Sequence, residues 1–570
     1  MQILAAVFPI VVLTVNRADS VILLLLGLTG IFAFFKFGIR GLALSRQELT
    51  LLLVFAGWYG IIVICYFAGD QTDTGFKMLG RSLRIAFLVP AYLACRQYLR
   101  DVRYLWAGLI IAPLVTLSYA LWQLVVAHAS IRVSGVVEAI PFGDLSIAMG
   151  FLAAAVFYAS PRPRSGWLLI LTCASLSAGI ATSILSQTRG GWLALPVLFA
   201  ATVMILSENS RKRAVRILAV SGALVVLVLL VSPYAIITDR INDAFGNYSQ
   251  YREYLNLIDK NDIARQGCIN NREFLDNLAR QIRQLHVRNL GVSVIDDGKR
   301  LDEAGFGSYC QSGYVLKVTD LIDSDNVMFR MQRYVADPGG MQEVRFIARG
   351  QGRLTLIYGY DKELNWTTID SSDYRLVAHR ELIKSLAWPD FWVPAGHSLY
   401  LVPVQAFAGE YAFPFVNNSV GQRLEMWRAA WHIFREYPVL GAGTGSFLGQ
   451  VDRRIREGEV FLSVISYDHP HNDLLNAMYG QGTLGLLAYL FALGYPLAIF
   501  AGALRNENRQ SRAAGFAGVI VVCGLFVFGL TETMFIHSIV ISWYVIFVSL
   551  LTAAVFRYNA IKSERRDEAA

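Results

Sequence analysis

Long apolar segments recur along this 570-residue chain, and they constrain its fold more than any other feature. Several of them exceed the length of about 18 residues that a helix needs to cross the hydrocarbon core of a membrane. Only 16% of the residues are charged, whereas a soluble domain carries about 25%. Because a chain in lipid must satisfy its backbone polar groups internally, these segments predict an all-α polytopic membrane protein.

We predict about twelve transmembrane helices, of which the first is short. About nine lie in an N-terminal membrane region, residues 1–236. About three lie in a C-terminal membrane region, residues 471–570, which ends in a cytoplasmic tail. The predicted spans are 2–15, 19–35, 49–68, 79–97, 104–126, 141–159, 166–185, 190–206, 215–236, 475–502, 513–531 and 536–556.

The basic residues follow the positive-inside rule, and this supports the predicted spans. They concentrate in one set of alternate short connections, at 36–46, 96–103, 162–164, 211–216 and 505–512. The intervening short connections hold few cations, namely Arg17, Lys77, Arg132 and Arg189. Both termini are therefore predicted in the cytoplasm and residues 237–470 on the opposite side. The net charge of +8 is explained by these connections and does not indicate a nucleic-acid partner.

Residues 237–418 are predicted to form an α+β insertion outside the membrane. From about 245 to 300 the apolar spacing favours helix. From about 313 to 416 short alternating segments, separated by Gly, Asp, Asn and Pro, favour strands and a small β-sandwich. Cys268 and Cys310 are able to form a disulfide if the insertion lies outside the cytoplasm.

The first polar motif is QTRGGW, residues 187–192, at a Gly-Gly turn between two apolar spans. Arg189 is a candidate functional residue because an ionisable group at a membrane boundary is costly to keep there. The alternative is that its side chain only reaches the interface and helps to end a helix. The spacing alone does not separate these two interpretations.

The second motif, SVGQRLEMW, opens a predicted amphipathic helix and loop, residues 419–470. Arg423 lies near the start of the helix, where a cation is unfavourable unless an anion binds beside it. The alternative is that Arg423 is solvated or pairs with Glu425. The helix is predicted to end at Pro438 and is suited to lie along the membrane surface. Its predicted apolar face consists of Leu424, Trp427, Ala430, Trp431 and Phe434.

The third motif is SYDHPHNDLL, residues 466–475, directly before a predicted span. A histidine there is able to act as a general base if a neighbouring carboxylate, Asp468 or Asp473, fixes its tautomer. The pair His469 and His471 is also compatible with a metal site, although the sequence shows no third ligand. The simplest alternative is a polar helix cap made by Asn472 or Asp473.

All three motifs are predicted on the same side of the membrane and at the same depth. Two arginines and a histidine base suit a reaction whose donor carries a diphosphate. The guanidinium groups would stabilise the charge on the leaving diphosphate, and the histidine would deprotonate an attacking hydroxyl.

Three stretches resemble the O-antigen ligase and O-antigen polymerase superfamily: TRGGW, SVGQRLEMWRAAWHIFREYPVLGAGTGSF and HPHNDLLNAMYGQGTLGLL. The loop RVSGVVEAIPFG, which begins at Arg132, is also similar to a loop of these proteins. The resemblance implies a GT-C-like membrane fold and inverting, metal-independent transfer of a glycan from undecaprenyl diphosphate, with no cofactor. It implies that His471 is the base, that Arg189 and Arg423 bind the diphosphate, and that His469 and Arg132 are secondary substrate-binding residues.

The resemblance favours a ligase in the inner membrane of a Gram-negative bacterium. Such a ligase transfers preassembled polysaccharide to a lipid A-core acceptor on the periplasmic face, and membrane lipid surrounds it. About 180 residues precede the second motif, more than such ligases usually have there, so the acceptor stays open. The alternatives are a polymerase or a protein O-oligosaccharyltransferase with the same donor, and a transporter of lipid-linked sugars. A transporter predicts internal repeats with charges near the midplane, and the sequence shows no such repeat.

Overall fold

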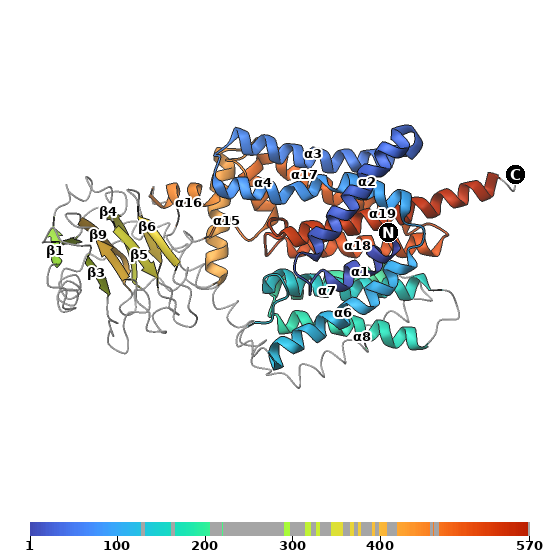
Figure 1. Cartoon of the computed structure of the whole chain (residues 1–570), viewed down its shortest axis with the longest axis horizontal. Helices are drawn as coiled ribbons and strands as arrows, with labels where there is room; N and C mark the ends of the chain where they lie inside the picture. The colour runs from blue at the N-terminus through green and yellow to red at the C-terminus, as the bar shows by residue number, and fades with distance from the viewer. Residues whose placement is uncertain are drawn as a thin grey trace. The chain divides into compact units, whose positions relative to one another are not determined.

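The computed structural model describes residues 1–126, 132–160, 166–205, 219, 419–456, 460 and 467–567, together with nine strands between 290 and 406 (Figure 1). The chain divides into two compact units. The first contains residues 1–239, 426–450 and 467–570, and the second contains residues 240–425 and 451–466. Three predictions lie outside the described residues: the predicted span 215–236 apart from residue 219, the possible disulfide Cys268–Cys310, and most of the predicted helical part of the insertion.

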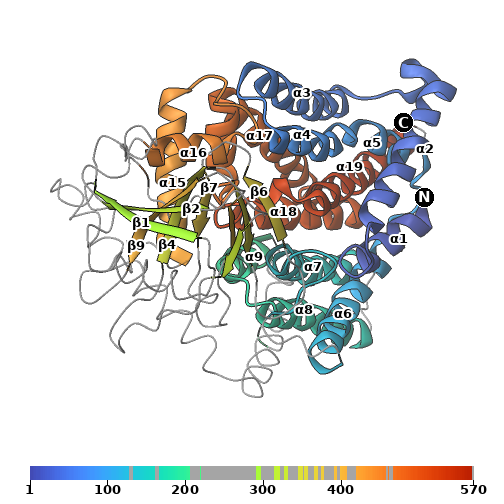
Figure 2. The same ribbon diagram turned by 60° about the vertical axis from the view of Figure 1, so that its left-hand side comes forward.

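The first unit is a bundle of apolar helices. Their bounds are α1 Gln2–Val11, α2 Ala18–Leu42, α3 Arg46–Ala68, α4 Asp73–Ala86, α5 Leu88–Tyr98, α6 Arg103–Val125, α7 Ala139–Ala159, α8 Gly166–Leu185, α9 Arg189–Ile205, α17 Asp473–Ala503, α18 Arg509–Phe528, the 3-10 helix η2 Met534–Ile536 and α19 Ser538–Asp567. Helix α18 packs against α7, α9, α17 and α19, which places it at the centre of the bundle (Figures 1 and 2). Among the described residues, nine helical segments are long and apolar enough to cross a membrane.

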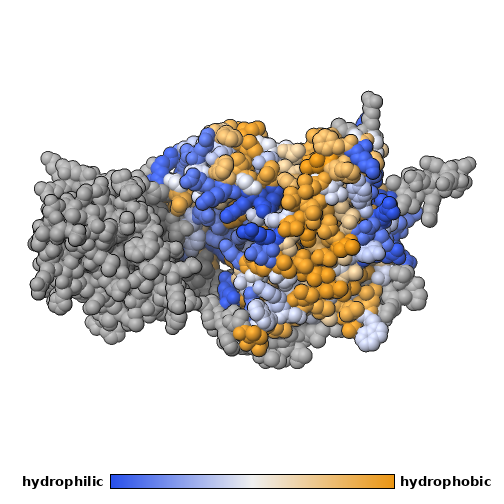
Figure 3. All heavy atoms as spheres, in the orientation of Figure 1, coloured by the Kyte–Doolittle hydropathy of each residue, from blue (hydrophilic) through white to orange (hydrophobic). Residues whose placement is uncertain are grey.

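This arrangement is that of a multi-pass membrane protein. Two further apolar helices, Gln2–Val11 and Gly190–Val203, are shorter, and α4 and α5 together make one span, Asp73–Tyr98. Because the predicted span 215–236 is not among the described residues, the count of twelve stays a prediction. Hydrophobic residues form a band across the helices on the face shown in Figure 3, as expected for a surface in contact with lipid.

The strands of the second unit form two antiparallel sheets. Their orders are β1-β2-β9-β4-β7 and β3-β8-β5-β6. The strands are β1 Leu290–Asp296, β2 Tyr314–Asp320, β3 Val327–Arg330, β4 Val344–Gly350, β5 Gly352–Leu356, β6 Asn365–Ile369, β7 Tyr374–Val377, β8 Asp390–Val393 and β9 Ser398–Ala406. The packing of the two sheets as a sandwich stays a prediction.

One sequence prediction in this unit is wrong, because helix was expected as far as residue 300. Residues 290–296 are a strand, β1, which pairs with β2 along its whole length. The segment LGVSVID alternates small polar and β-branched apolar residues, a period-2 pattern that favours a strand once a partner is present.

Helix α15, Ser419–Glu436, ends two residues before Pro438, as predicted, but its buried face shares only Ala430 with the predicted one. In the first unit the buried side chains are Met426, Ala429, Ala430 and Ile433, which follow helical spacing. Trp431 was predicted on the apolar face and is 47% exposed. The small alanines allow close packing on the neighbouring face, and the large rings remain at its edge.

A glycine-rich loop leads from α15 to the next helix, α16 Phe447–Arg456, and contacts α17 where that helix bends. The loop amide of Ala442 donates to the carbonyl of Tyr479 over 2.7 Å, and the amide of Thr483 donates to the carbonyl of Pro438 over 2.8 Å. Between these contacts Gly482 has φ 65° and ψ −159°, inside α17. A Cβ at Gly482 would overlap the carbonyl of Val439, so only glycine fits this bend.

We expect Gly482→Ala to destabilise the protein by about 1–3 kcal/mol or more, because this backbone conformation is essentially restricted to glycine. Gly494→Ala in the same helix is the matched control, since a Cβ there meets nothing within 4 Å. Thermal unfolding of both variants in one detergent measures the difference. An equal melting temperature for the two would contradict the assigned role of Gly482.

Candidate functional site

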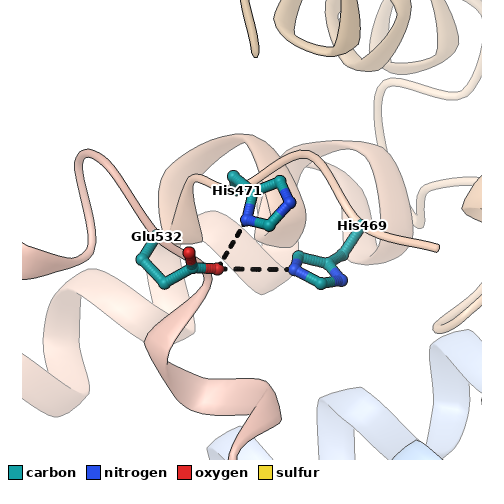
Figure 4. A group of neighbouring side chains, drawn as sticks. All are labelled: His469, His471 and Glu532. Carbon is teal, nitrogen blue, oxygen red and sulfur yellow. Dashed lines mark hydrogen bonds and ion pairs between the residues drawn. The ribbon is translucent and has the colours of Figure 1, made fainter. Parts of the chain in front are cut away.

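Two histidines and one glutamate meet at the start of α17 (Figure 4). His471 Nδ1 is 2.7 Å from Glu532 Oε1, a hydrogen-bond distance. His469 Nε2 is 3.4 Å from the same oxygen, within ion-pair range but without a hydrogen bond. His469 Nδ1 is 2.6 Å from Asp468 Oδ1, and the two imidazole centres are 4.3 Å apart. The structure therefore brings both predicted histidines together around a carboxylate that sequence reasoning missed.

The cluster is built by hydrogen bonds between the start of α17 and the connection from α18 to α19. Asn472 caps α17, because its Oδ1 accepts the amide of Leu475 over 3.0 Å. Its own amide donates to Thr533 Oγ1, and its side-chain nitrogen donates to the carbonyl of Leu530. The cap is thus Asn472, one of the two residues that the sequence offered, and it holds the segment that carries Glu532 in place.

His471 lies in a tight turn directly before this cap. Its φ of 50° is in the left-handed region, which is uncommon for a residue with a side chain. The carbonyl of the preceding Pro470 accepts a hydrogen bond of 2.9 Å from Trp427 Nε1 on α15. Left-handed backbone at a non-glycine residue recurs at functional sites, where the surrounding contacts hold it.

The hydrogen bond to Glu532 determines which nitrogen of His471 is free. Glu532 is buried, and its Oε1 also accepts the amide of Thr533 over 3.0 Å. A carboxylate only accepts, so His471 donates from Nδ1, and the assigned neutral tautomer leaves its Nε2 as an acceptor. This is the arrangement of a general base that is oriented by a third group.

The charges in the cluster support one another. Burial lowers the pKa of His469, but its hydrogen bond with Asp468 and its ion-pair contact with Glu532 outweigh that effect and raise the pKa to about 9. The contact with His469 lowers the pKa of Asp468. Burial raises the pKa of Glu532, but its contacts with His469 and His471 bring it far below its ordinary value. At neutral pH Glu532 and Asp468 are therefore anionic and His469 is cationic.

The turn that carries Arg189 contacts the same connection. Arg189 is the first residue of α9, and its side chain is not among the described ones. A Cβ added to the next residue, Gly190, would be 2.7 Å from Thr531 Oγ1, which directly precedes Glu532. The same Cβ would be 3.0 Å from Oδ2 of Asp144 on α7. The backbone of the predicted arginine motif therefore lies beside the histidine cluster.

Arg132 contacts the backbone of this turn. Its Nε donates to the carbonyl of Ser186 over 3.0 Å, and a terminal nitrogen donates to the carbonyl of Gln187 over 3.2 Å. Gln187 itself has a φ of 56°, so the chain turns sharply before Arg189. Arg132 was predicted to bind substrate, and the structure shows it bound to the turn that presents Arg189.

Arg423 belongs to the second compact unit, so its predicted place beside the histidines stays a prediction. Asp144 and Glu532 are the residues of this site that sequence reasoning missed. Asp144 is fully buried in a predicted span, where a carboxylate is a functional candidate by default. A search for ionisable residues within the predicted spans could therefore have identified Asp144 from the sequence.

A pocket of about 480 Å³, including the part open to solvent, lies next to the cluster between α3, α4, α17 and η2. Asp473, two residues after His471, forms part of its wall, and Trp58, Tyr489 and Phe535 are other lining residues. The rings of these three pack edge to face, with centres 5.3 to 5.9 Å apart. The pocket is therefore mostly apolar, with polar groups near the histidines.

The cluster is also a candidate for a metal ion. One ligand atom each of His469, His471 and Glu532 lies within 4.8 Å of the others, and imidazole and carboxylate ligands suit zinc. Glu532 is the third ligand that the sequence did not reveal. The direct hydrogen bond between His471 and Glu532 is equally that of a base and its orienting carboxylate. A metal-independent reaction stays a prediction.

Comparison with known proteins points to one superfamily. The family described as O-Antigen ligase matches residues 404–490, which include Arg423, His469 and His471. This match supports membership of the O-antigen ligase superfamily, the one that the sequence motifs indicate, and with it a glycosyltransferase-like membrane enzyme. An uncharacterized protein of Haemophilus influenzae is 20% identical over 122 residues, 21% of this chain. The aligned part spans 31% of the length of that relative.

We expect Asp468→Asn to lower the pKa of His469, because it removes one of the two anions that raise it to about 9. A raised folded-state pKa stabilises the protein below the unfolded value, about 6.5, and this stabilisation is lost as the pH rises through about 9. The variant should therefore lose more melting temperature at pH 6 than at pH 9.5.

Asp101→Asn is the control, because that aspartate pairs with Arg103 at a distant connection. Histidine NMR titration measures the pKa, and thermal unfolding at the two pH values measures stability. An unchanged His469 titration in Asp468→Asn would contradict the assigned electrostatics.

Proposed function

We propose that this protein is a glycosyltransferase of the O-antigen ligase type. It transfers preassembled polysaccharide from undecaprenyl diphosphate to a hydroxyl of the lipid A-core oligosaccharide, on the periplasmic face of the inner membrane. The observation that carries this proposal is the His471–Glu532 pair, which lies beside the turn of Arg189. His471 also lies within the region matched by the family.

His471 is the general base in this reaction. Its Nε2 accepts the proton of the acceptor hydroxyl while that oxygen attacks the anomeric carbon of the donor sugar. The bond from this carbon to the diphosphate oxygen breaks at the same time, with inversion, and its electrons leave with undecaprenyl diphosphate. Glu532 holds Nδ1–H throughout and stabilises the imidazolium that forms, as the carboxylate of a catalytic triad does.

The arginines act on the leaving group. Arg189 and Arg423 bind the diphosphate, and their positive charge stabilises the negative charge that develops as the glycosidic bond breaks. Arg132 fixes the turn before Arg189 through two backbone carbonyls. His469, kept cationic by Asp468 and Glu532, adds a positive charge beside His471. No metal ion enters this mechanism.

A polymerase of repeat units or a protein O-oligosaccharyltransferase would use the same donor chemistry with another acceptor. The distinguishing feature would be the acceptor site, for which the insertion at 237–418 is the candidate. A deletion strain separates these functions. Loss of core-linked ladders with accumulation of lipid-linked polymer indicates a ligase, and a single capped repeat indicates a polymerase.

We expect His471→Ala to lower kcat by a factor of about 10²–10⁴, the usual contribution of general base catalysis. Arg189→Ala and Arg423→Ala should raise KM for the donor and lower kcat, because they act on the diphosphate. Arg100→Ala is the control, since this exposed cation follows the C-terminal end of α5, whereas α4 precedes the N-terminal end of that helix. Transfer is measured in membranes with lipid-linked donor. Full activity of His471→Ala would disprove the mechanism.

Glu532→Gln should lower kcat at least about a hundredfold with little change in KM, because it removes the anion that orients and stabilises His471. Chelators should leave the rate of the wild type unchanged. Loss of activity on chelation, with recovery when zinc is added, would favour the metal site instead.

For the Glu532→Gln variant, Asp101→Asn serves again as the carboxylate control. A Glu532→Gln enzyme as active as the wild type would show that the pair has no role in the base step.

A further inference from the structure

Helix α4 has two different faces, and only one of them belongs to the pocket beside the histidines. Met78, Ser82 and Ile85 are buried and line that pocket. The adjacent face carries three cations at the same helical spacing, Lys77, Arg81 and Arg84, which we call the basic face of α4. Two of these three cations lie inside the predicted span 79–97, and no sequence motif gave them a role.

In the part of the protein that the structure describes, these cations have no directly paired counter-charge, and Asp19 is linked to Arg84 only through Ser20, whose Oγ donates to Asp19 Oδ2 over 3.2 Å. None of them forms an ion pair within 4.0 Å, and Asp73, one turn before Lys77, forms none either. Arg84 donates to Ser20 Oγ over 3.1 Å, whereas Lys77 and Arg81 are exposed. Like charges one helical turn apart repel and destabilise a helix. The basic face is therefore suited to an anion that arrives from outside the chain.

The position of the basic face indicates that this anion is attached to a lipid. The span that begins at Asp73 continues to Tyr98, and at 1.5 Å per residue Arg81 lies about 12 Å along it. Phe76 and Leu83 on the same helix are 67% and 43% exposed, as expected for side chains in contact with acyl chains. Figure 3 shows hydrophilic residues beside the hydrophobic band, in the region where α4 lies in Figure 1. A soluble anion would have to leave water to reach this depth.

The basic face is also electrostatically close to the catalytic cluster. Helix α4 packs against η2 and α19, which directly follow Glu532. Burial lowers the pKa of His537 in this connection, Glu532 and Glu138 oppose that effect, and the charges of His469 and Arg81 add to the lowering. Arg81 therefore acts on the same connection as the histidine cluster. An anion on Arg81 would lie close to the site of reaction.

We propose that the basic face of α4 binds the diphosphate of the lipid-linked donor as the donor arrives from the membrane. Lys77 and Arg81 supply charge-assisted hydrogen bonds to the phosphate oxygens. Arg84, held by Ser20, continues the positive surface along the helix. This inference rests on the proposed function, because it takes the donor to be a polyprenyl diphosphate. It adds a binding surface that neither the motifs nor the family match identifies.

The test uses the full chain in phosphatidylcholine nanodiscs and compares undecaprenyl diphosphate with undecaprenol, which has the same chain without phosphate. We expect the wild type to bind the diphosphate at least about tenfold more tightly than the alcohol, since each charged contact contributes about that factor. The double variant Lys77→Gln/Arg81→Gln should show a preference reduced severalfold, with the remainder due to Arg189 and Arg423, and Arg100→Gln should keep the full preference. An undiminished preference in the double variant would overturn the proposal.

Two further measurements distinguish donor binding from bulk lipid binding and from a structural role of the cations. Phosphatidylglycerol in excess should not displace the diphosphate, and equal displacement would overturn the proposal by assigning the face to bulk anionic lipid. Without ligand the double variant should melt at or above the wild-type temperature, because like-charge repulsion is removed. A lower melting temperature together with an unchanged diphosphate preference would show a structural role and overturn the proposal.

His471→Ala keeps the failure of this inference distinct from the failure of the proposed function. It should bind undecaprenyl diphosphate as the wild type does and fail in transfer. If it retains transfer, the proposed function is wrong whatever the basic face binds. If it behaves as expected and the double variant binds normally, only the basic face is wrongly assigned.

Discussion

The hydrogen bond between His471 and Glu532 depends on two segments that are 61 residues apart and meet end to end. The start of α17 and the connection from α18 to α19 are joined by backbone and side-chain bonds of Asn472 and Asp473. These bonds satisfy polar groups that would otherwise be exposed at a helix terminus. The same bonds fix the distance from the imidazole to the carboxylate. The cap and the His471–Glu532 pair are therefore one structure, and a change to Asn472 would disturb both.

Much of the helical bundle could be predicted because apolar periodicity and length determine it directly. Eleven of the twelve predicted spans overlap described helices. The structure brings His471 and the backbone of the Arg189 turn into one region, and the roles assigned to them stay predictions. What the sequence did not reveal is long-range pairing. Glu532 lies in TETMF between two spans, and nothing in its local pattern indicates a histidine partner. The prediction of the buried face of α15 was partly wrong for a related reason. Tertiary packing buries the small alanines of this helix and leaves Trp431 exposed.

The cations of α4 show a different limit of sequence reasoning. A span is recognised from its average hydropathy. Arg81 and Arg84 were therefore included in the predicted span 79–97, and their charges were not considered separately. The structure separates them from Met78, Ser82 and Ile85 and shows that α4 is two-faced. Asp144 was absorbed in the same way into the segment 141–159. In each case a charged residue within an apolar segment was informative, but the mean hydropathy of the segment did not reveal it.

Buried and exposed charged residues of the membrane region have different kinds of partner. The carboxylates near the Arg189 turn and the histidines, Asp144 and Glu532, are buried and interact within the protein itself. The exposed cations, Lys77 and Arg81, are unpaired within the described chain and available to an external anion. Desolvation explains this division, because a buried carboxylate must be satisfied internally. In the proposed assignment, Lys77 and Arg81 are satisfied instead by the diphosphate of a donor that arrives with its own apolar chain.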